Sequence, residues 1–301
     1  MVLSPMAASD QAESRRTARM DIAVLQQWVG KTQSASDQVT PYPIAALAAT
    51  LDQDLAVPVA SDPIPPLWHW LYFLEAHRQS ELGDDGHAKR GGFLPPVSLP
   101  RRMWAGGRFE FHDPLRVGET YTRTSRIVAV HEKKGRTGNL IFLTVRHEIG
   151  NPRGIALIED QELVYRDNAR PGLPAPGASA APADPRWERV VKPSDVLLFR
   201  YSALTFNSHR IHYDRRYATE TEGYPGLVVH GPLVATLLLD LAHRHMPEAD
   251  FARFEFRAVS PLFDTSPFKV CGRPESDGKT ISLWAADANG GVAMTAIATT
   301  L

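Results

Sequence analysis

A nearly unbroken apolar run in the second half of the chain limits its possible folds more than any other feature. The run, LVATLLLDL from Leu233 to Leu241, follows Gly231 and Pro232, which favours a helix that begins there. A helix that is apolar on nearly all sides needs burial all round. Four extended segments follow it without a helical pattern between them, at 253–262, 268–273, 280–286 and 292–300. We therefore expect a curved antiparallel sheet wrapped around this helix.

The first half of the chain repeats this plan. A helix is predicted over residues 40–51, TPYPIAALAATL, because the segment begins with Thr and Pro and continues with small and apolar residues. The tetrapeptide Arg-Phe-Glu-Phe occurs in both halves, at 108–111 and 253–256, and a Pro-Leu pair follows each copy. The two halves therefore look like copies of one helix-on-sheet unit. Extended segments follow the first helix at 108–115, 120–131, 139–149 and 155–166.

Two such units side by side predict an α+β double hotdog, in which two helix-wrapped antiparallel sheets join edge to edge with the helices inside. A doubly wound α/β fold would need helices between successive strands, and these strands follow one another directly.

The composition changes along the chain suggest where the domains begin and end. A short amphipathic helix over 20–30 and a strand over 196–201 are also expected. The predicted parts are a disordered tail at 1–19, an N-terminal hotdog at 20–166 with a long cover insertion at 53–107, a Pro-, Ala- and Gly-rich linker at 167–186, and a C-terminal catalytic hotdog at 187–301.

Charge and cysteine content exclude several classes of function. The formal net charge is −1 and the basic residues form no long block, which argues against a nucleic-acid partner. No stretch approaches the ~20 apolar residues that span a bilayer, so we expect no membrane partner. The single cysteine, Cys271, has no partner for a disulfide, which fits a reducing compartment such as the cytoplasm.

The residues that carry chemistry lie just before the apolar helix. The segment FNSHRIHYD contains a histidine-rich turn from Asn207 to His212, and Gly231 stands at the mouth of the helix. An imidazole can move a proton, and free backbone N–H groups at a helix start can hold a developing oxyanion. The pairing predicts an enzyme that acts on a carbonyl compound. His209 and His212 have a spacing that metal ligands use, but no third ligand follows, so we expect no metal.

The segment SALTFNSHRIHYD, followed by the helix entrance GLVVHGPL, resembles the MaoC-like hydratase/dehydratase family. The segments GGFLPPVSLPRRMW and WAGGRFEFHDPLRVGE resemble the N-terminal hotdog of its two-domain members, which include mitochondrial-type 3-hydroxyacyl-thioester dehydratases and the mesaconyl- and itaconyl-CoA hydratases. The resemblance extends over most of the chain. It implies an enzyme without a cofactor that adds water to, or removes it from, an acyl thioester.

The resemblance also assigns roles to individual residues. His212 matches the family's catalytic histidine, and Gly231 matches the glycine whose N–H holds the thioester oxygen. The family's catalytic aspartate falls on Asn207, which is a departure, because an amide cannot act as a base. We expect Asn207 to bind the water while His212 transfers the proton.

The resemblance implies an acyl-CoA thioester as substrate, by preference a branched C5 dicarboxylyl group (mesaconyl-CoA or itaconyl-CoA, giving citramalyl-CoA). Arginines are candidates for its free carboxylate, and the aromatic residues of the cover could roof the pocket. The expected substrate-binding residues are Arg200, Arg210, Arg102, Trp68, Trp70 and His230.

Three other activities stay open at this stage. A straight-chain 3-hydroxyacyl-thioester dehydratase of fatty-acid synthesis would use the same fold and residues. A thioesterase would need a carboxylate where this chain has Asn207, and a non-catalytic thioester-binding module would explain the lost acid. Whether CoA or a carrier protein presents the acyl group, and whether the protein forms a homodimer, also stays open.

Overall fold

The computed structural model describes residues 22–135, 138–167 and 179–301. The expected tail at 1–19 lies outside these residues, and so does most of the expected linker at 167–186. Within the described ranges, no helix is long and apolar enough to cross a membrane.

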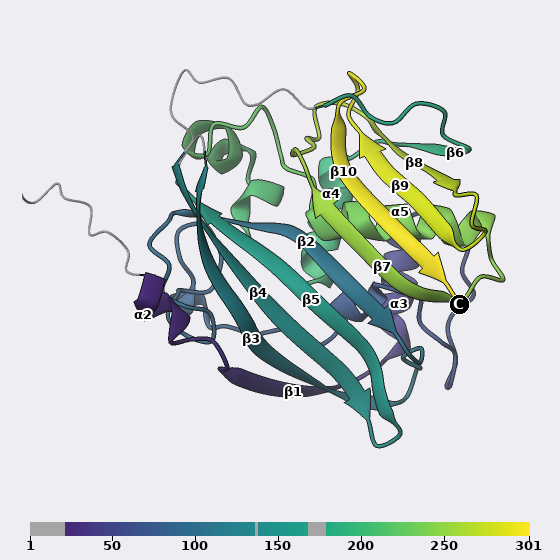
Figure 1. Ribbon diagram of the computed structural model, residues 1–301, viewed down its shortest axis with the longest axis horizontal. Coiled ribbons are helices and arrows are strands. Elements are labelled where there is room, and N and C mark those ends of the chain that lie inside the picture. Colours follow the sequence, from purple (N-terminus) through teal and green to yellow (C-terminus); the bar gives the residue numbers. More distant parts are fainter. Residues whose placement is uncertain (1–21, 136–137, 168–178) are drawn as a thin grey trace, which may run out of the picture.

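One antiparallel sheet of ten strands forms the front of the molecule in Figure 1, with the order β1-β3-β4-β5-β2-β7-β10-β9-β8-β6. The first half contributes β1 (Thr32–Gln38), β2 (Arg101–Phe111), β3 (Thr120–Gly135), β4 (Gly138–Asn151) and β5 (Gly154–Arg166). The second half contributes β6 (Trp187–Val191), β7 (Phe251–Ala258), β8 (Phe268–Pro274), β9 (Thr280–Ala286) and β10 (Val292–Thr300). The predicted α+β double hotdog is confirmed.

The repeated Arg-Phe-Glu-Phe segments form the junction between the two halves. They lie on β2 and β7, which pair antiparallel, and Phe109 stands directly opposite Phe254. Arg108 faces Glu255 on one side of this pair, and Glu110 faces Arg253 on the other. Equivalent residues of the two copies therefore meet in reversed order, as two similar units related by a two-fold rotation would.

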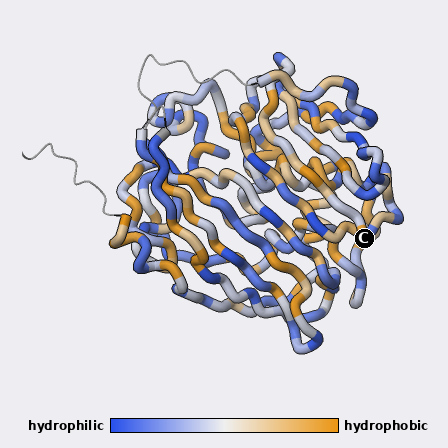
Figure 2. The backbone as a smooth tube through the Cα atoms, viewed as in Figure 1, coloured by the Kyte–Doolittle hydropathy of each residue, from blue (hydrophilic) through white to orange (hydrophobic). Residues whose placement is uncertain are grey.

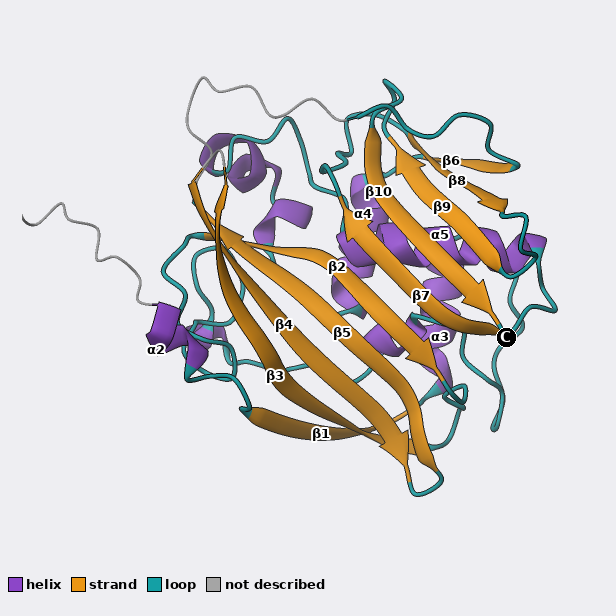
Figure 3. Cartoon of the chain, in the orientation of Figure 1, coloured by secondary structure: helices purple, strands orange, loops and turns teal. Residues whose placement is uncertain are grey.

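Alternation along the strands gives the sheet one buried face. In β4, Ile141, Leu143, Val145 and Ile149 are buried, and the residues between them are more exposed. Figure 2 shows hydrophobic and hydrophilic positions alternating along these strands. The buried face therefore turns toward the helices, which lie behind the sheet in Figure 3.

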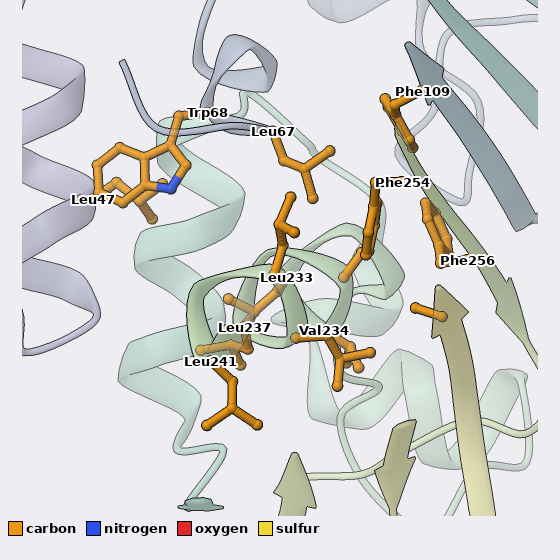
Figure 4. Packing of buried hydrophobic residues seen from close by; sticks show 14 of the residues in the cluster. Leu47, Leu67, Trp68, Phe109, Leu233, Val234, Leu237, Leu241, Phe254 and Phe256 are labelled. Atoms are coloured by element: carbon orange, nitrogen blue, oxygen red, sulfur yellow. The ribbon is translucent and has the colours of Figure 1, made fainter. Parts of the chain in front are cut away.

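The central helix is α5 (Gly231–His245), which packs against β8, β9 and β10. Its leucines enter a single core with Leu47 of α3 (Pro41–Thr50), with Trp68, and with the aromatic residues of the β2–β7 junction, as Figure 4 shows. Because this core draws on both halves of the chain, burial of one half depends on the other.

Two helical segments depart from the sequence-based predictions. The strand expected at 196–201 is wrong: these residues belong to α4 (Asp195–Leu204). The Ser194 hydroxyl accepts a hydrogen bond from the Leu197 N–H at 3.2 Å, so a capping residue decides in favour of helix. The helix expected at 20–30 is shorter within the described residues, as α2 (Ile22–Gln26). The helix expected at 40–51 is found as α3, which packs on α4.

The concave face of the first half is covered by the segment at 53–100. It ends where β2 begins, at Arg101, which corrects the expected end of the cover at 107. Its regular parts are the short 3-10 helices η1 (Trp68–Leu71) and η2 (Gln79–Glu81). Val97 and Leu99 pack on Leu143 and Leu163 of the sheet at one end. The remaining space beneath the cover stays open as a cavity.

Candidate active site

A cavity of about 1570 Å³ lies between the cover, the histidine-rich turn and the buried face of the first half of the sheet. Both halves of the chain line it. His212, Asn207 and Gly231 all line this cavity, so the structure brings the three predicted catalytic residues to one space.

His212 closes the short 3-10 helix η3 (Arg210–His212) and is buried. Its Nδ1–H donates to the Val228 carbonyl at 2.7 Å, which leaves the lone pair on Nε2. Burial lowers the pKa of His212 from 6.5 to about 4. The ring is therefore neutral at neutral pH and can accept a proton.

His230 supports His212 from behind. The two rings stack with centroids 3.7 Å apart and planes inclined by 17°. His230 Nε2 lies 2.8 Å from the Ser202 hydroxyl, and its buried Nδ1 has no hydrogen-bond partner among the described residues. Burial lowers the pKa of His230 well below 6.5. It is not among the residues that line the cavity, so the structure places it against His212 and not beside a substrate.

Gly231 is the first residue of α5, where backbone N–H groups have no partner within the helix. Pro232 follows it and has no N–H, so Gly231 carries the donor at this point of the turn. A Cβ at position 231 would meet only the Trp104 carbonyl oxygen, at 3.9 Å, so there is space on the Cβ side of this residue. The positive end of the helix dipole adds to its attraction for a developing oxyanion.

Asn207 lines the cavity, but its side chain also shapes the turn. Its Oδ1 accepts a hydrogen bond from the His209 N–H at 3.0 Å. This bond occupies one acceptor position of Oδ1, while the amide nitrogen keeps two hydrogens to donate. The expectation that Asn207 binds the water stays a prediction.

His87 of the cover lines the same cavity, and sequence reasoning missed both this residue and its partner Asp85. Asp85 Oδ2 accepts a hydrogen bond from His87 Nδ1 at 3.1 Å, and Asp85 Oδ1 accepts one from the His87 backbone N–H at 2.9 Å. The His87 ring lies 4.0 Å from that of His209, which in turn lies 5.4 Å from that of His212. The sequence GDDGH marks a turn, but nothing in it links these residues to a motif some 120 positions later.

The cover is fastened to the histidine-rich turn by close backbone contact. Gly86 has φ +87°, and a Cβ there would lie 1.9 Å from the Ser208 carbonyl oxygen. The Ser208 hydroxyl donates to the Gly86 carbonyl, and the Arg210 N–H donates to the Asp85 carbonyl at 2.9 Å. Glycine is required at this crossing, and the crossing positions His87.

Among the described residues, one group of side chains could hold a metal ion: Asp85, His87 and His209. Their donor atoms all lie within 4.8 Å of one another. The direct hydrogen bond between His87 and Asp85 already uses one nitrogen and one oxygen of this set. Asp85 and His87 therefore form a hydrogen-bonded pair, and the His209 ring lies 4.0 Å from that of His87. The expectation that the site binds no metal stays a prediction.

The three predicted arginines lie in different surroundings. Arg102 lines the cavity, and among the described residues its guanidinium has no hydrogen-bond or ion-pair partner. The Arg210 guanidinium instead pairs with Asp214 at 2.7 Å and donates to the Asp84 carbonyl. Arg200 is exposed on α4, and neither it nor Arg210 lines the cavity. Arg200 is therefore not placed to bind a substrate in this cavity.

The aromatic residues of the cover divide between core and cavity. Trp68 is buried in the core and does not line the cavity. Trp70 lines it and packs edge-on against Trp104 with ring centroids 5.2 Å apart. Because the Trp104 carbonyl lies next to Gly231, these two indoles connect the helix start to the far end of the cavity.

The far end of the cavity is polar. The buried Glu159 accepts hydrogen bonds from His69 Nε2 at 2.9 Å and from Trp70 Nε1 at 3.3 Å. Burial would raise the pKa of Glu159, but the hydrogen bond from His69 leaves it below 4.5. His147 and Gln161 line the same region. An acyl group that reaches this far meets hydrogen-bonding groups.

A neutral imidazole and a helix N-terminus on one cavity, inside two joined hotdog units, define the class of hotdog hydratases and dehydratases. Residues 67–264 match the model of the family described as hydroxyacyl-thioester dehydratase type 2. The chain belongs to this MaoC-like family, and it is an enzyme of the hydro-lyase type.

Two curated relatives are similar over most of their length. Mesaconyl-C(4)-CoA hydratase of Chloroflexus aurantiacus is 47% identical over 272 residues, which cover 89% of this chain and 95% of the relative. The mitochondrial hydroxyacyl-thioester dehydratase type 2 of Schizosaccharomyces pombe is 31% identical, over 78% of this chain and 88% of the relative. The crystal structure of a MaoC-like dehydratase from Phytophthora capsici shares the fold, with a TM-score of 0.66 and 16% identity over 93% of this chain and 99% of that one.

Proposed function

We propose that the protein catalyses the reversible hydration of an α,β-unsaturated acyl-CoA thioester, with a branched C5 dicarboxylyl-CoA as preferred substrate. Mesaconyl-CoA or itaconyl-CoA would give citramalyl-CoA. The observation that carries the proposal is that His212 and Gly231, the first residue of α5, line one cavity. The 47% identity to mesaconyl-C(4)-CoA hydratase supports the choice of acyl group.

The thioester carbonyl oxygen accepts the Gly231 N–H at the positive end of α5, so negative charge that develops on it is stabilised. His212 Nε2 takes a proton from water while the water oxygen bonds to the β-carbon. The electrons of the double bond move into an enolate on the thioester. The imidazolium then returns the proton to the α-carbon, which restores neutral His212. If the proton is delivered to the same face of the double bond as the water oxygen, the addition is syn.

Arg102 is the side chain proposed to bind the free carboxylate of a dicarboxylyl group. It lines the cavity, and its charge acts on His87, whose pKa is lowered chiefly by burial and secondly by Arg102. A guanidinium without a protein partner can form a bidentate pair with a carboxylate. The polar far end around Glu159 further favours a short polar acyl group over a long aliphatic one, because an alkyl chain there would desolvate Glu159 without replacing its hydrogen bonds.

A panel of unsaturated C4 to C8 acyl-CoAs tests the proposal. We expect the highest kcat/KM with mesaconyl-CoA or itaconyl-CoA. Hydration is measured as the loss of absorbance where the substrate has a conjugated double bond, and as the amount of hydrated product where it has none. Release of free CoA thiol would instead indicate a thioesterase. No turnover of any thioester would indicate a binding module.

A straight-chain 3-hydroxyacyl-thioester dehydratase is the second candidate function, and the 31% identity to the dehydratase of Schizosaccharomyces pombe favours it. The same panel separates the two. A higher kcat/KM for crotonyl-CoA and longer straight-chain substrates than for the dicarboxylyl thioesters would select the dehydratase.

Location and assembly complete the proposal. A cytoplasmic location is supported by the buried, unpaired Cys271. Among the described residues, the edge strands β1 and β6 each pair with one neighbour, and a homodimer would pair the outer edge of one of them with a second copy. Light scattering of the purified protein would measure its mass in solution directly.

A further inference from the structure

We propose that His87 is a second catalytic residue of this site, which binds the reacting water, and that Asp85 is the positioning residue that orients it. The proposal rests on the proposed hydration. Asn207 stands where the family has an aspartate, so the carboxylate expected near His212 is missing. The cover supplies an acceptor in its place, from the other half of the chain.

The first step is the placement of His87. Its ring lines the cavity and lies 4.0 Å from His209, which contacts His212 in turn. The Gly86 crossing and the Arg210 N–H bond to the Asp85 carbonyl hold this part of the cover against the turn. His87 therefore belongs to the same site as His212, although more than 120 residues separate them.

The second step is the tautomer. Burial opposes the ionisation of Asp85, but the hydrogen bonds from His87 lower its pKa below 3.8, so it carries a negative charge. A carboxylate can only accept, and His87 Nδ1 must therefore carry the hydrogen. The lone pair of His87 lies on Nε2, the same arrangement that the Val228 carbonyl imposes on His212. The site thus has two imidazoles, each with a basic Nε2.

The third step compares the other side chains around the site. Asn207 has its amide oxygen engaged with the His209 N–H, and His230 does not line the cavity. Arg102 is a donor with no acceptor atom. Among the described side chains of the turn and the cover that line the cavity, His87 has an acceptor nitrogen that is oriented by a hydrogen bond to a second side chain. Its ring reaches His212 through the ring of His209.

In the resulting step, one hydrogen of the water is accepted by His87 Nε2 and the other is transferred to His212 Nε2. The water oxygen bonds to the β-carbon, and the π electrons move into the enolate. His212 returns its proton to the α-carbon. The hydrogen held by His87 stays on oxygen and becomes the product hydroxyl, so one water is consumed and both imidazoles end neutral.

Two substitutions separate a catalytic role of His87 from a structural one. His87→Asn keeps a donor near the position of Nδ1 for Asp85 but has no atom near Nε2. His87→Gln can place its amide oxygen near Nε2 but gives up the bond to Asp85. We expect H87N to lower kcat about 100-fold with little change in KM, and H87Q to lower it less. The reverse order, or a wild-type kcat in H87N, would overturn the proposal.

Asp85→Asn tests the positioning role, with Asp84→Asn as the matched control because Asp84 is exposed in the same loop. We expect a loss of about 10-fold in kcat for D85N and none for D84N. The double variant D85N/H87N should be no slower than H87N, since Asp85 acts through His87. Independent, multiplying losses would overturn the positioning role.

Two further readouts complete the experiment. Added imidazole should partly restore His87→Ala, which a purely structural loss would not allow. Activity that disappears on chelation and returns with a divalent cation would overturn the proposal, because Asp85, His87 and His209 would then be ligands. If the wild-type protein hydrates no thioester, the proposed function fails. If it does and H87N is equally active, only the present inference fails.

Discussion

The imidazole rings of His212 and His230 stack at 3.7 Å in a buried site, and both are neutral at neutral pH. The folded state holds them, together with His87, in the form that does not carry a charge. Lowering the pH therefore favours the unfolded chain, whose histidines bind protons that these folded rings do not. The fold is most stable when these rings are neutral, and the proposed chemistry needs the same neutral form as its base.

The first prediction is acid destabilisation. The pKa of His212 and that of His87 are each lowered from 6.5 to about 4, so neither costs stability above pH 6.5. As pH falls from 6.5 towards 4, the unfolded chain binds protons that the folded chain does not, and each site costs up to ~3 kcal/mol. Urea unfolding at pH 7.5, 6 and 5 measures this loss. His230→Phe, which keeps a stacked ring but cannot titrate, should show a smaller loss, and a stability that is flat with pH would contradict the account.

The second prediction concerns the crossing of cover and turn. Gly86→Ala adds a methyl group 1.9 Å from the Ser208 carbonyl oxygen at a positive φ, so the two segments must separate. We expect about 1–3 kcal/mol of destabilisation and a large loss of kcat, because His87 moves with the cover. Thermal unfolding and steady-state kinetics check both. Gly92→Ala is the control, since nothing lies within 4 Å of a Cβ there.

The third prediction concerns substrate charge. Arg102→Gln should lower kcat/KM about 10- to 100-fold for a dicarboxylyl-CoA, which is the effect of losing a charged hydrogen bond. It should change kcat/KM little for crotonyl-CoA, which has no free carboxylate. Arg200→Gln is the control because Arg200 is exposed outside the cavity. Equal losses of kcat/KM on both substrates would show that Arg102 binds the CoA moiety, which both share, or stabilises the fold.

The fourth prediction concerns the junction of the two halves. Phe254 is buried opposite Phe109, with ring centroids 5.9 Å apart, in a core that both halves share. Phe254→Ala should cost about 3–5 kcal/mol. Because the core is shared, unfolding should stay a single transition by circular dichroism and by tryptophan fluorescence. Two separated transitions would show that the halves fold independently.

Local sequence patterns were enough to predict most of the sheet and the central helix. Alternation marks a strand wherever one face is buried, and the apolar run of α5 has no other place than the core. The same reasoning failed for α4. Its apolar residues suggested a strand, but the Ser194 hydroxyl caps a helix start at this point. Sequence reasoning also missed the edge strands: β1 is polar and has no buried residue, and β6 has only five residues, which is too short for a clear alternation.

The site was predicted where its residues are close in the sequence and missed where they are not. His212 and Gly231 follow from a motif and a helix start. His87 and Asp85 reach the site only because the cover crosses the turn at Gly86, a contact between distant segments that has no local pattern. Arg210 was assigned to substrate, yet its guanidinium lies in bonds to Asp214 and Asp84 that hold the same crossing.

The most direct test of the account is the hydration rate of mesaconyl-CoA by His212→Gln, measured beside the wild type with circular dichroism to show that both are folded. Glutamine keeps a polar side chain of similar reach but cannot take a proton at neutral pH. We predict a loss of at least about 100-fold in kcat with the fold intact. Turnover at the wild-type rate in that variant would contradict the account.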